Sequence, residues 1–155
     1  MVTEARSSSP EETLEIGRDL GRRLKGNEII LLSGELGSGK TLLAKGIASG
    51  LGIPASEVVS PSFTLMNVHH GRINLYHFDL YRLGLENRRV DPDGIDEYIG
   101  QGVIVVEWAQ YLDKSFFALK EAITIELTGS GDQTRLIRIR AKPKSARRPA
   151  STSIR

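Results

Sequence analysis

The amino-acid sequence predicts an α/β fold: a mixed sheet with parallel central strands, antiparallel hairpins near its edges and helices on both faces. Two apolar runs, at 29–32 and 103–106, are continuous rather than alternating, which is typical of central strands buried on both faces. A glycine-rich turn separates the first run from an alanine- and leucine-rich segment that predicts a helix. Elsewhere, paired segments that flank glycines predict hairpins.

The elements follow in order along the chain. Ser9, Pro10 and Glu12 have the form of a helix start, with an N-cap, a proline at the first position and a capping box, and Gly26 is a candidate stop. Strand 29–32 and helix 41–51 come next. The remaining predicted elements are a hairpin of strands 63–68 and 73–78, a short helix around 95–99, strand 103–106, and a closing hairpin of strands 123–127 and 136–140.

Length and charge predict one folded domain with polar ends. The chain has 155 residues, about the size of a single domain. We expect a flexible N-terminus over 1–9, a folded domain over 10–140 and a disordered basic tail over 141–155. All 19 acidic residues lie at or before Asp132, whereas eight of the 21 basic residues lie from Arg135 onward. The tail is either a solvated extension or an electrostatic arm for RNA or an acidic protein.

Composition excludes several classes of protein. The chain has no cysteine, which removes disulfides, thiolate nucleophiles and cysteine-ligated metal centres. It has no apolar run near the roughly 18 residues that a membrane span needs, and its first ten residues lack the apolar core of a secretory signal. We therefore expect a cytoplasmic protein with no membrane partner.

The glycine-rich turn is a full match to the phosphate-binding motif G-x-x-x-x-G-K-[ST]. Its glycines let backbone N–H groups surround an anion, and the following helix directs its positive end to the same place. Lys40 can reach the β- and γ-phosphates, and the Thr41 hydroxyl can bind Mg²⁺. The sequence therefore predicts a P-loop NTPase-like sheet with a nucleoside triphosphate and Mg²⁺ as ligands, although the motif does not decide which base the nucleotide carries. The nucleotide-binding residues predicted from the motif are Glu35, Leu36, Gly37, Ser38, Gly39, Lys40 and Thr41.

A P-loop also needs a carboxylate at the end of a neighbouring strand. Glu107 follows the apolar run 103–106, and Asp79 ends the predicted strand before it. We expect Glu107 near the metal and Asp79 either farther from it or positioning the attacking water, although the sequence does not decide which contacts Mg²⁺ directly. Trp108 either packs the end of the sheet or lies near the nucleotide. The three histidines lack metal-ligand spacing, so we assign them no zinc-binding or general-base role.

Four segments in this order resemble the bacterial TsaE (YjeE) family, the small ATPase of tRNA threonylcarbamoyladenosine biosynthesis. They are the P-loop 34–41, Ser-Pro-Ser-Phe-Thr-Leu at 60–65, His-Phe-Asp-Leu-Tyr-Arg at 77–82 and Val-Glu-Trp at 106–108. The resemblance spans roughly 10–140, which makes this stretch a P-loop ATPase domain. Ala109 departs from the family, in which proline commonly follows the tryptophan.

The resemblance implies a Mg²⁺-dependent ATPase that is weakly active alone. It implies binding to the two-subunit complex that transfers threonylcarbamoyl to the adenosine beside the anticodon, with ATP supporting turnover, and contact with tRNA through that complex or the basic tail. Lys40, Asp79 and Thr64 would be catalytic residues, Thr64 sensing the γ-phosphate. Thr41 and Glu107 would bind Mg²⁺. Thr13 and Arg135 match positions near the nucleotide base.

Two other classes of function compete with this one. A small-molecule phosphotransferase could use the same loop, with loop arginines at 82, 88 and 89 closing over the phosphates. Alternatively, the basic tail could bind RNA while nucleotide binding is only structural. A regulatory GTPase is disfavoured, because Asp-Pro-Asp-Gly at 91–94 follows no apolar strand and the sequence has no N-K-x-D motif.

Overall fold

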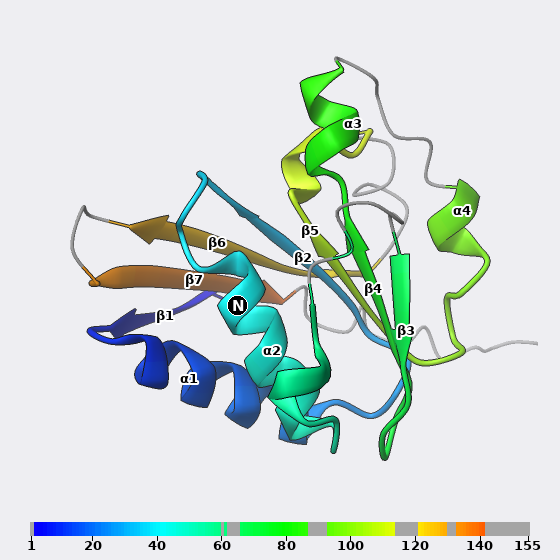
Figure 1. Ribbon diagram of the computed structural model, residues 1–155, viewed down its shortest axis with the longest axis horizontal. Coiled ribbons are helices and arrows are strands. Elements are labelled where there is room, and N and C mark those ends of the chain that lie inside the picture. Colours follow the sequence, from blue (N-terminus) through cyan, green and yellow to red (C-terminus); the bar gives the residue numbers. More distant parts are fainter. Residues whose placement is uncertain are drawn as a thin grey trace, which may run out of the picture.

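The computed structural model describes residues 2–59, 61, 66–86, 93–113, 121–129 and 133–141. Within these ranges, seven strands form one sheet in the order β1-β7-β6-β2-β5-β4-β3 (Figure 1). The strands are β1 (Val2–Ser7), β2 (Ile29–Gly34), β3 (Met66–His69), β4 (Leu75–Asp79), β5 (Val103–Glu107), β6 (Ile123–Gly129) and β7 (Arg135–Ala141). The helices are α1 (Pro10–Arg23), α2 (Lys40–Gly50), α3 (Tyr81–Leu85) and α4 (Asp93–Asp96), with 3₁₀ turns η1 (Ala55–Glu57) and η2 (Ala109–Tyr111).

The centre of the sheet is parallel and its edges are antiparallel, which confirms the predicted fold class. Strands β6, β2, β5 and β4 run parallel to one another. The pairs β6–β7, β1–β7 and β3–β4 are antiparallel. Because β2, β4 and β5 are parallel, their carboxyl ends meet at one edge, where Glu107 is opposite both Leu32 and Asp79 in the register. This edge holds the candidate site.

The two faces of the sheet have different cover. Helices α1 and α2 lie side by side on one face, over an aliphatic core that includes Ile30, Leu32 and Val105 (Figure 1). The other face carries an aromatic core around Tyr76 and Phe78, against which side chains of α3, α4 and η2 pack. The prediction of helices on both faces is confirmed, although on the second face they are short.

The N-terminus differs from the prediction of a flexible segment over 1–9. Residues Val2–Ser7 form β1, which pairs with β7 over its whole length, from Val2 opposite Arg140 to Ser7 opposite Arg135. The strand is stabilised by its backbone ladder more than by apolar side chains, because most of its residues are exposed. Its sequence therefore lacks the hydrophobic alternation by which a half-buried strand is recognised.

Helix α1 begins where the capping motif predicted and ends before the predicted stop. The Ser9 hydroxyl accepts the Glu12 N–H at 3.1 Å, while Glu12 Oε1 accepts the N–H of Ser8 at 2.6 Å, one residue earlier than in a standard capping box. The helix ends at Arg23 because the backbone of the next residue is extended. Gly26, the predicted stop, lies in the loop beyond it, with a φ of 122°.

Helices α1 and α2 contact each other backbone to backbone through glycines. Gly17 and Gly21 of α1 face Gly46 and Gly50 of α2, and both pairs have the four-residue spacing that places residues on one helix face. A Cβ added to Gly17 would lie 2.6 Å from the Leu43 carbonyl oxygen, a distance that no ordinary packing allows. We call these four residues the glycine seam. It makes the helix that follows the P-loop part of a tightly packed pair.

Three other expectations concern local structure. The predicted hairpin at 63–78 is present as β3 and β4, although 63–65 lie outside the described residues. The short helix expected at 95–99 begins earlier, as α4. The predicted basic tail lies outside the described residues except Ala141, which ends β7. Within the described ranges, no helix combines the length and apolar character that crossing a membrane requires.

Candidate functional site

The phosphate-binding loop joins the carboxyl end of β2 to α2, the position that its motif requires. Gly37 and Gly39 have φ angles of 80° and 103°, which residues with a Cβ rarely adopt, so the turn depends on both glycines. Within the described residues, no side chain caps the first turn of α2, whose N-cap is Gly39. The free N–H groups and the positive end of the helix dipole therefore favour an anion in the loop.

Lys40, the first residue of α2, is buried and directs its ammonium group back into the loop. Its Nζ donates hydrogen bonds to the carbonyl oxygens of Gly34 and Glu35, each at 2.8 Å. Burial lowers the pKa of Lys40, whereas the nearby carboxylates, first Glu107 and then Asp79, act in the opposite direction. The loop thus holds its own lysine on backbone oxygens, in the place where phosphate oxygens would bind.

Glu107 ends β5 beside the loop and is 1% exposed. Its Oε1 accepts the hydroxyl of Thr41 at 2.8 Å. Its Oε2 lies 2.6 Å from Nε2 of His77, which comes from the neighbouring strand β4. Both carboxylate oxygens therefore have fixed partners on different elements, which holds Glu107 in one orientation.

Asp79 ends β4 next to Glu107 and is 7% exposed. Its Oδ1 accepts the backbone N–H of Tyr81 at 2.9 Å, where α3 begins. A pocket of about 290 Å³ lies between Asp79, Lys40, Thr41 and Glu107. The structure thus brings together four of the residues that the sequence singled out, from β4, β5 and α2.

The oxygen donors of this pocket fit Mg²⁺. The described residues contain no group of three or more His, Cys, Asp or Glu side chains that could hold a metal ion. Mg²⁺ does not need one, because it commonly takes one or two protein oxygens and completes its shell with substrate phosphates and water. Thr41 and Glu107 provide a hydroxyl and a carboxylate 2.8 Å apart. Of the two candidate carboxylates, Glu107 is the one that is hydrogen-bonded to Thr41.

Thr13 and Arg135, which the resemblance associates with the base, both lie beside Gly39. A Cβ at Gly39 would be 3.9 Å from Arg135 Nε and 4.0 Å from Thr13 Cγ2. Arg135 Nη2 donates to the Gly37 carbonyl oxygen at 3.0 Å. Thr13 is buried, with its hydroxyl 2.7 Å from that of Ser7. The two residues therefore lie beside Gly39, and Arg135 also lines the side of the loop away from Asp79.

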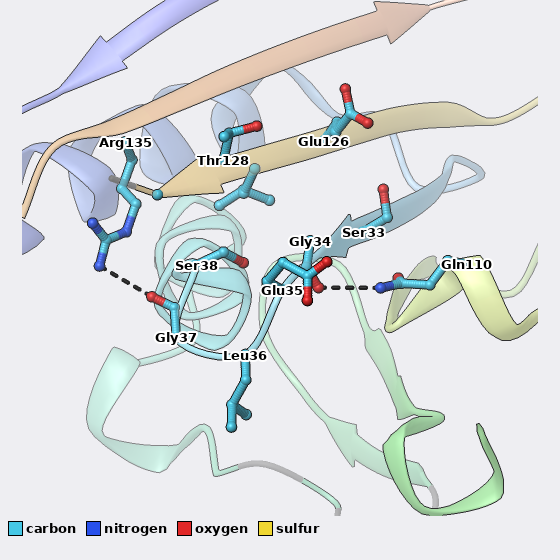
Figure 2. Close-up of a pocket in the computed structure, with 12 residues that line it drawn as sticks. Ser33, Gly34, Glu35, Leu36, Gly37, Ser38, Gln110, Glu126, Thr128 and Arg135 are labelled. Carbon is cyan, nitrogen blue, oxygen red and sulfur yellow. Dashed lines mark hydrogen bonds between the residues drawn. The ribbon is translucent and has the colours of Figure 1, made fainter. Parts of the chain in front are cut away.

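A second pocket, of about 690 Å³, lies on this other side of the loop (Figure 2). Figure 2 shows it between the P-loop and the end of β6, with Arg135 at one end and Gln110 at the other. The loop residues Glu35, Leu36 and Ser38 line it. Most of the predicted nucleotide-binding residues thus line one of two pockets on the two sides of the loop, while Leu36 lines both and Thr13 lines neither.

Trp108 combines the two interpretations that the sequence left open. It packs in the aromatic core, with its ring 5.8 Å from that of Tyr111, and it also covers the lysine, with Lys40 Nζ 3.8 Å from its centroid. In the described part of the chain it is the only residue besides glycine with a positive φ, of 60°. Ala109 then begins η2, so a turn forms there without proline.

The site also contains residues that sequence reasoning missed, and one predicted residue is not described. His77 contacts Glu107, and Gln110 of η2 donates from Nε2 to the Gly34 carbonyl oxygen at 3.1 Å. The signal for His77 was its place two residues before Asp79, which puts both on one face of the strand. Gln110 carries no such signal. Thr64 lies outside the described residues, so its predicted role stays a prediction.

Comparisons with known proteins agree with this geometry. The family model described as "Threonylcarbamoyl adenosine biosynthesis protein TsaE" matches residues 7–137. A tRNA threonylcarbamoyladenosine biosynthesis protein TsaE from Treponema pallidum is 36% identical over 127 residues, covering 82% of this chain and 93% of that protein. Its namesake from Bacillus subtilis is 39% identical over 134 residues, covering 85% and 81%. The crystal structure of Bacillus subtilis YdiB matches with a TM-score of 0.69 and 31% identity, covering 91% of this chain and 86% of YdiB.

Proposed function

The chain belongs to the TsaE family, as its motifs predicted, and from this premise we propose that it is a Mg²⁺-dependent ATPase of tRNA modification. Its relatives are named for the biosynthesis of threonylcarbamoyladenosine in tRNA. We propose that ATP binding and hydrolysis by this chain support repeated turnover of the complex that transfers the threonylcarbamoyl group.

One observation carries the proposal. Lys40, Thr41 and Glu107 converge at the carboxyl edge of the parallel strands, where the free N–H groups of α2 also point. A cation, a hydroxyl and a buried carboxylate around one anion-binding turn are the parts that phosphoryl transfer requires. A turn that only connected a strand to a helix would gain nothing from burying a lysine and a glutamate together.

The residues on the Asp79 side of the loop would act on the phosphates. When ATP enters, Lys40 exchanges its two carbonyl partners for oxygens of the β- and γ-phosphates, and the loop amides bind the remaining oxygens. Thr41 and Glu107 would hold Mg²⁺, which supplies positive charge where negative charge develops on the transferring phosphate. Asp79 would orient the water that attacks the γ-phosphate in line with the leaving oxygen, with Thr64 as a sensor of that phosphate.

The other side of the loop would hold the rest of the nucleotide. The larger pocket begins at the loop and is lined by Arg135, and Thr13 lies close to Gly39 at the end of the loop. We propose that these two residues bind near the base or ribose. None of the described residues that line the smaller pocket is an arginine, so among them Lys40 is the side chain that would neutralise the γ-phosphate. This supports slow hydrolysis by the chain alone and stimulation by a partner, the two-subunit threonylcarbamoyl-transferase complex.

The test is an assay of phosphate release from ATP labelled at the γ-position, with and without that complex. The wild-type chain should release free phosphate in a Mg²⁺-dependent manner, faster with the complex present. Lys40→Ala should lose this activity, and Lys25→Ala, which removes an exposed lysine away from the loop, should keep it. Label that appears in a metabolite instead of free phosphate would replace the proposal with a phosphotransferase.

A further inference from the structure

The best-defined unassigned feature of the molecule is the histidine that contacts Glu107. His77 is fully buried in the middle of β4, where it is opposite Val105 in the register. Its neighbour on the same face of the strand is Asp79, and Glu107 lies diagonally across on β5. His77 therefore reaches the Glu107 carboxylate from inside the protein, whereas Thr41 reaches it from the pocket.

The hydrogen-bonding state of His77 fixes its tautomer. The Nε2 atom lies 2.6 Å from Glu107 Oε2, and a carboxylate only accepts, so Nε2 carries the proton and donates. The Nδ1 atom is buried and has no hydrogen-bond partner among the described residues. In this tautomer Nδ1 bears a lone pair, so the ring makes one directed hydrogen bond and has one acceptor that no described residue satisfies.

A histidine in this environment stabilises the fold less than an apolar side chain would. A buried polar atom without a partner costs free energy that an apolar side chain of similar size would avoid. What the hydrogen bond provides is a fixed orientation of the Glu107 carboxylate, because this side chain can rotate about its bonds unless both oxygens are held. His77 restrains Oε2, which leaves Oε1 directed at Thr41 and the pocket.

We propose that His77 is a positioning residue, which orients Glu107 so that Thr41 and Glu107 together present two oxygens to a divalent cation bound with the nucleotide. The inference deepens the proposed function and rests on it. It assigns His77 no contact with the metal or with the nucleotide. Hydrogen bonds of this kind to metal ligands typically change metal affinity or activity by about 10–100-fold.

The test compares His77→Leu with His77→Gln, a variant whose amide can donate the same hydrogen bond. Trp108 is the only tryptophan and lies against Lys40, so its fluorescence reports nucleotide binding directly. ADP affinity is measured first in EDTA and then as a function of Mg²⁺ concentration. In His77→Leu, the Mg²⁺ concentration that gives half of the Mg²⁺-dependent change in ADP affinity should rise about 10–100-fold, while the ADP affinity in EDTA stays that of the wild type. In His77→Gln this Mg²⁺ concentration should return most of the way to the wild-type value.

Controls separate the possible outcomes. His69→Leu changes a histidine on the adjacent strand and should leave the Mg²⁺ dependence unchanged. If His77→Leu does not fold, as judged by thermal unfolding, His77→Asn takes its place, since its shorter amide cannot reach Glu107. The inference is overturned if a folded variant shows the wild-type Mg²⁺ dependence. It is also overturned if the variant loses as much ADP affinity in EDTA as it does in Mg²⁺. If the wild-type chain binds no nucleotide, the proposed function itself fails.

Discussion

The two sides of the P-loop are built in different ways. On the β5 side, the charged groups Lys40, Glu107 and Asp79 are buried within the sheet edge and hydrogen-bonded there, Glu107 to partners from two elements. On the β6 side, the pocket is more than twice as large and its lining is more exposed, with Glu35, Glu126 and Thr128 all exposed. The first side has the fixed geometry that phosphate chemistry demands, and the second has room for the rest of a ligand.

The sharpest test of this contrast is the lysine at its centre. Lys40→Ala should reduce ATP hydrolysis by at least about 10²–10³-fold, because it removes the main positive charge on the protein side of the phosphates. The fold should survive, since the ammonium group mainly bonds the loop itself. Circular dichroism and phosphate release measured on the same sample check both statements. Hydrolysis that persists would place the catalytic centre elsewhere.

Asp79 tests whether the β5 side performs chemistry or only binds. Asp79→Ala should reduce the rate of hydrolysis by about 10²-fold, and ATP affinity should change little, because the carboxylate would act on the attacking water. Trp108 fluorescence gives the affinity and single-turnover kinetics give the rate. Equal losses in both quantities would show that Asp79 belongs to the binding site for the phosphates.

On the β6 side we expect the reverse of the Asp79 result, a loss of ATP affinity with little change in the rate of hydrolysis. Arg135→Ala should weaken ATP binding about 5-fold, which corresponds to the loss of roughly one hydrogen bond at a partly exposed position, and leave the rate at saturation nearly unchanged. Arg138→Ala, which removes another β7 arginine that instead pairs with Glu4, is the matched control. A loss of rate without a loss of affinity would contradict the division between the two sides.

The smallest effect concerns acid stability and comes from His69 of the edge strand β3, away from the loop. Burial lowers the pKa of His69. The folded state therefore binds a proton at His69 less readily than the unfolded chain does. Stability from this residue is complete above about pH 6.5, the unfolded pKa, and declines as the pH falls below it. Urea unfolding of His69→Asn should depend less on pH between 6.5 and 5 than wild type, and an identical profile would contradict this.

Much of this organisation could be predicted from local sequence, because the relevant signals are local. The P-loop follows a continuous apolar run, and a second run ends in Glu107, so the parallel register brings the two together. Strand β1 could not be found in this way, because backbone pairing with β7 stabilises it without an apolar pattern. His77 and Gln110 were missed because their contacts depend on distances across strands and turns that spacing alone does not supply.

The glycine seam was also within reach of sequence reasoning and was not used. Gly17 and Gly21, like Gly46 and Gly50, are four residues apart, which is a pattern for close helix contact when it occurs in two neighbouring helices. Taken singly, each glycine only lowers helix propensity. The pattern becomes informative when both helices are placed on the same face of the sheet.

The seam has a mechanical consequence for the whole molecule. No layer of side chains separates α1 from α2 at the seam, so the two backbones are in direct contact. A movement of one helix must therefore displace the other. At one end of this pair, α2 begins at the lysine of the P-loop and Thr13 of α1 lies beside Gly39. The Thr13 hydroxyl is also hydrogen-bonded to that of Ser7 in β1. Thr13 thereby joins an edge strand of the sheet to the loop, so a displacement at either one is transmitted through a single residue.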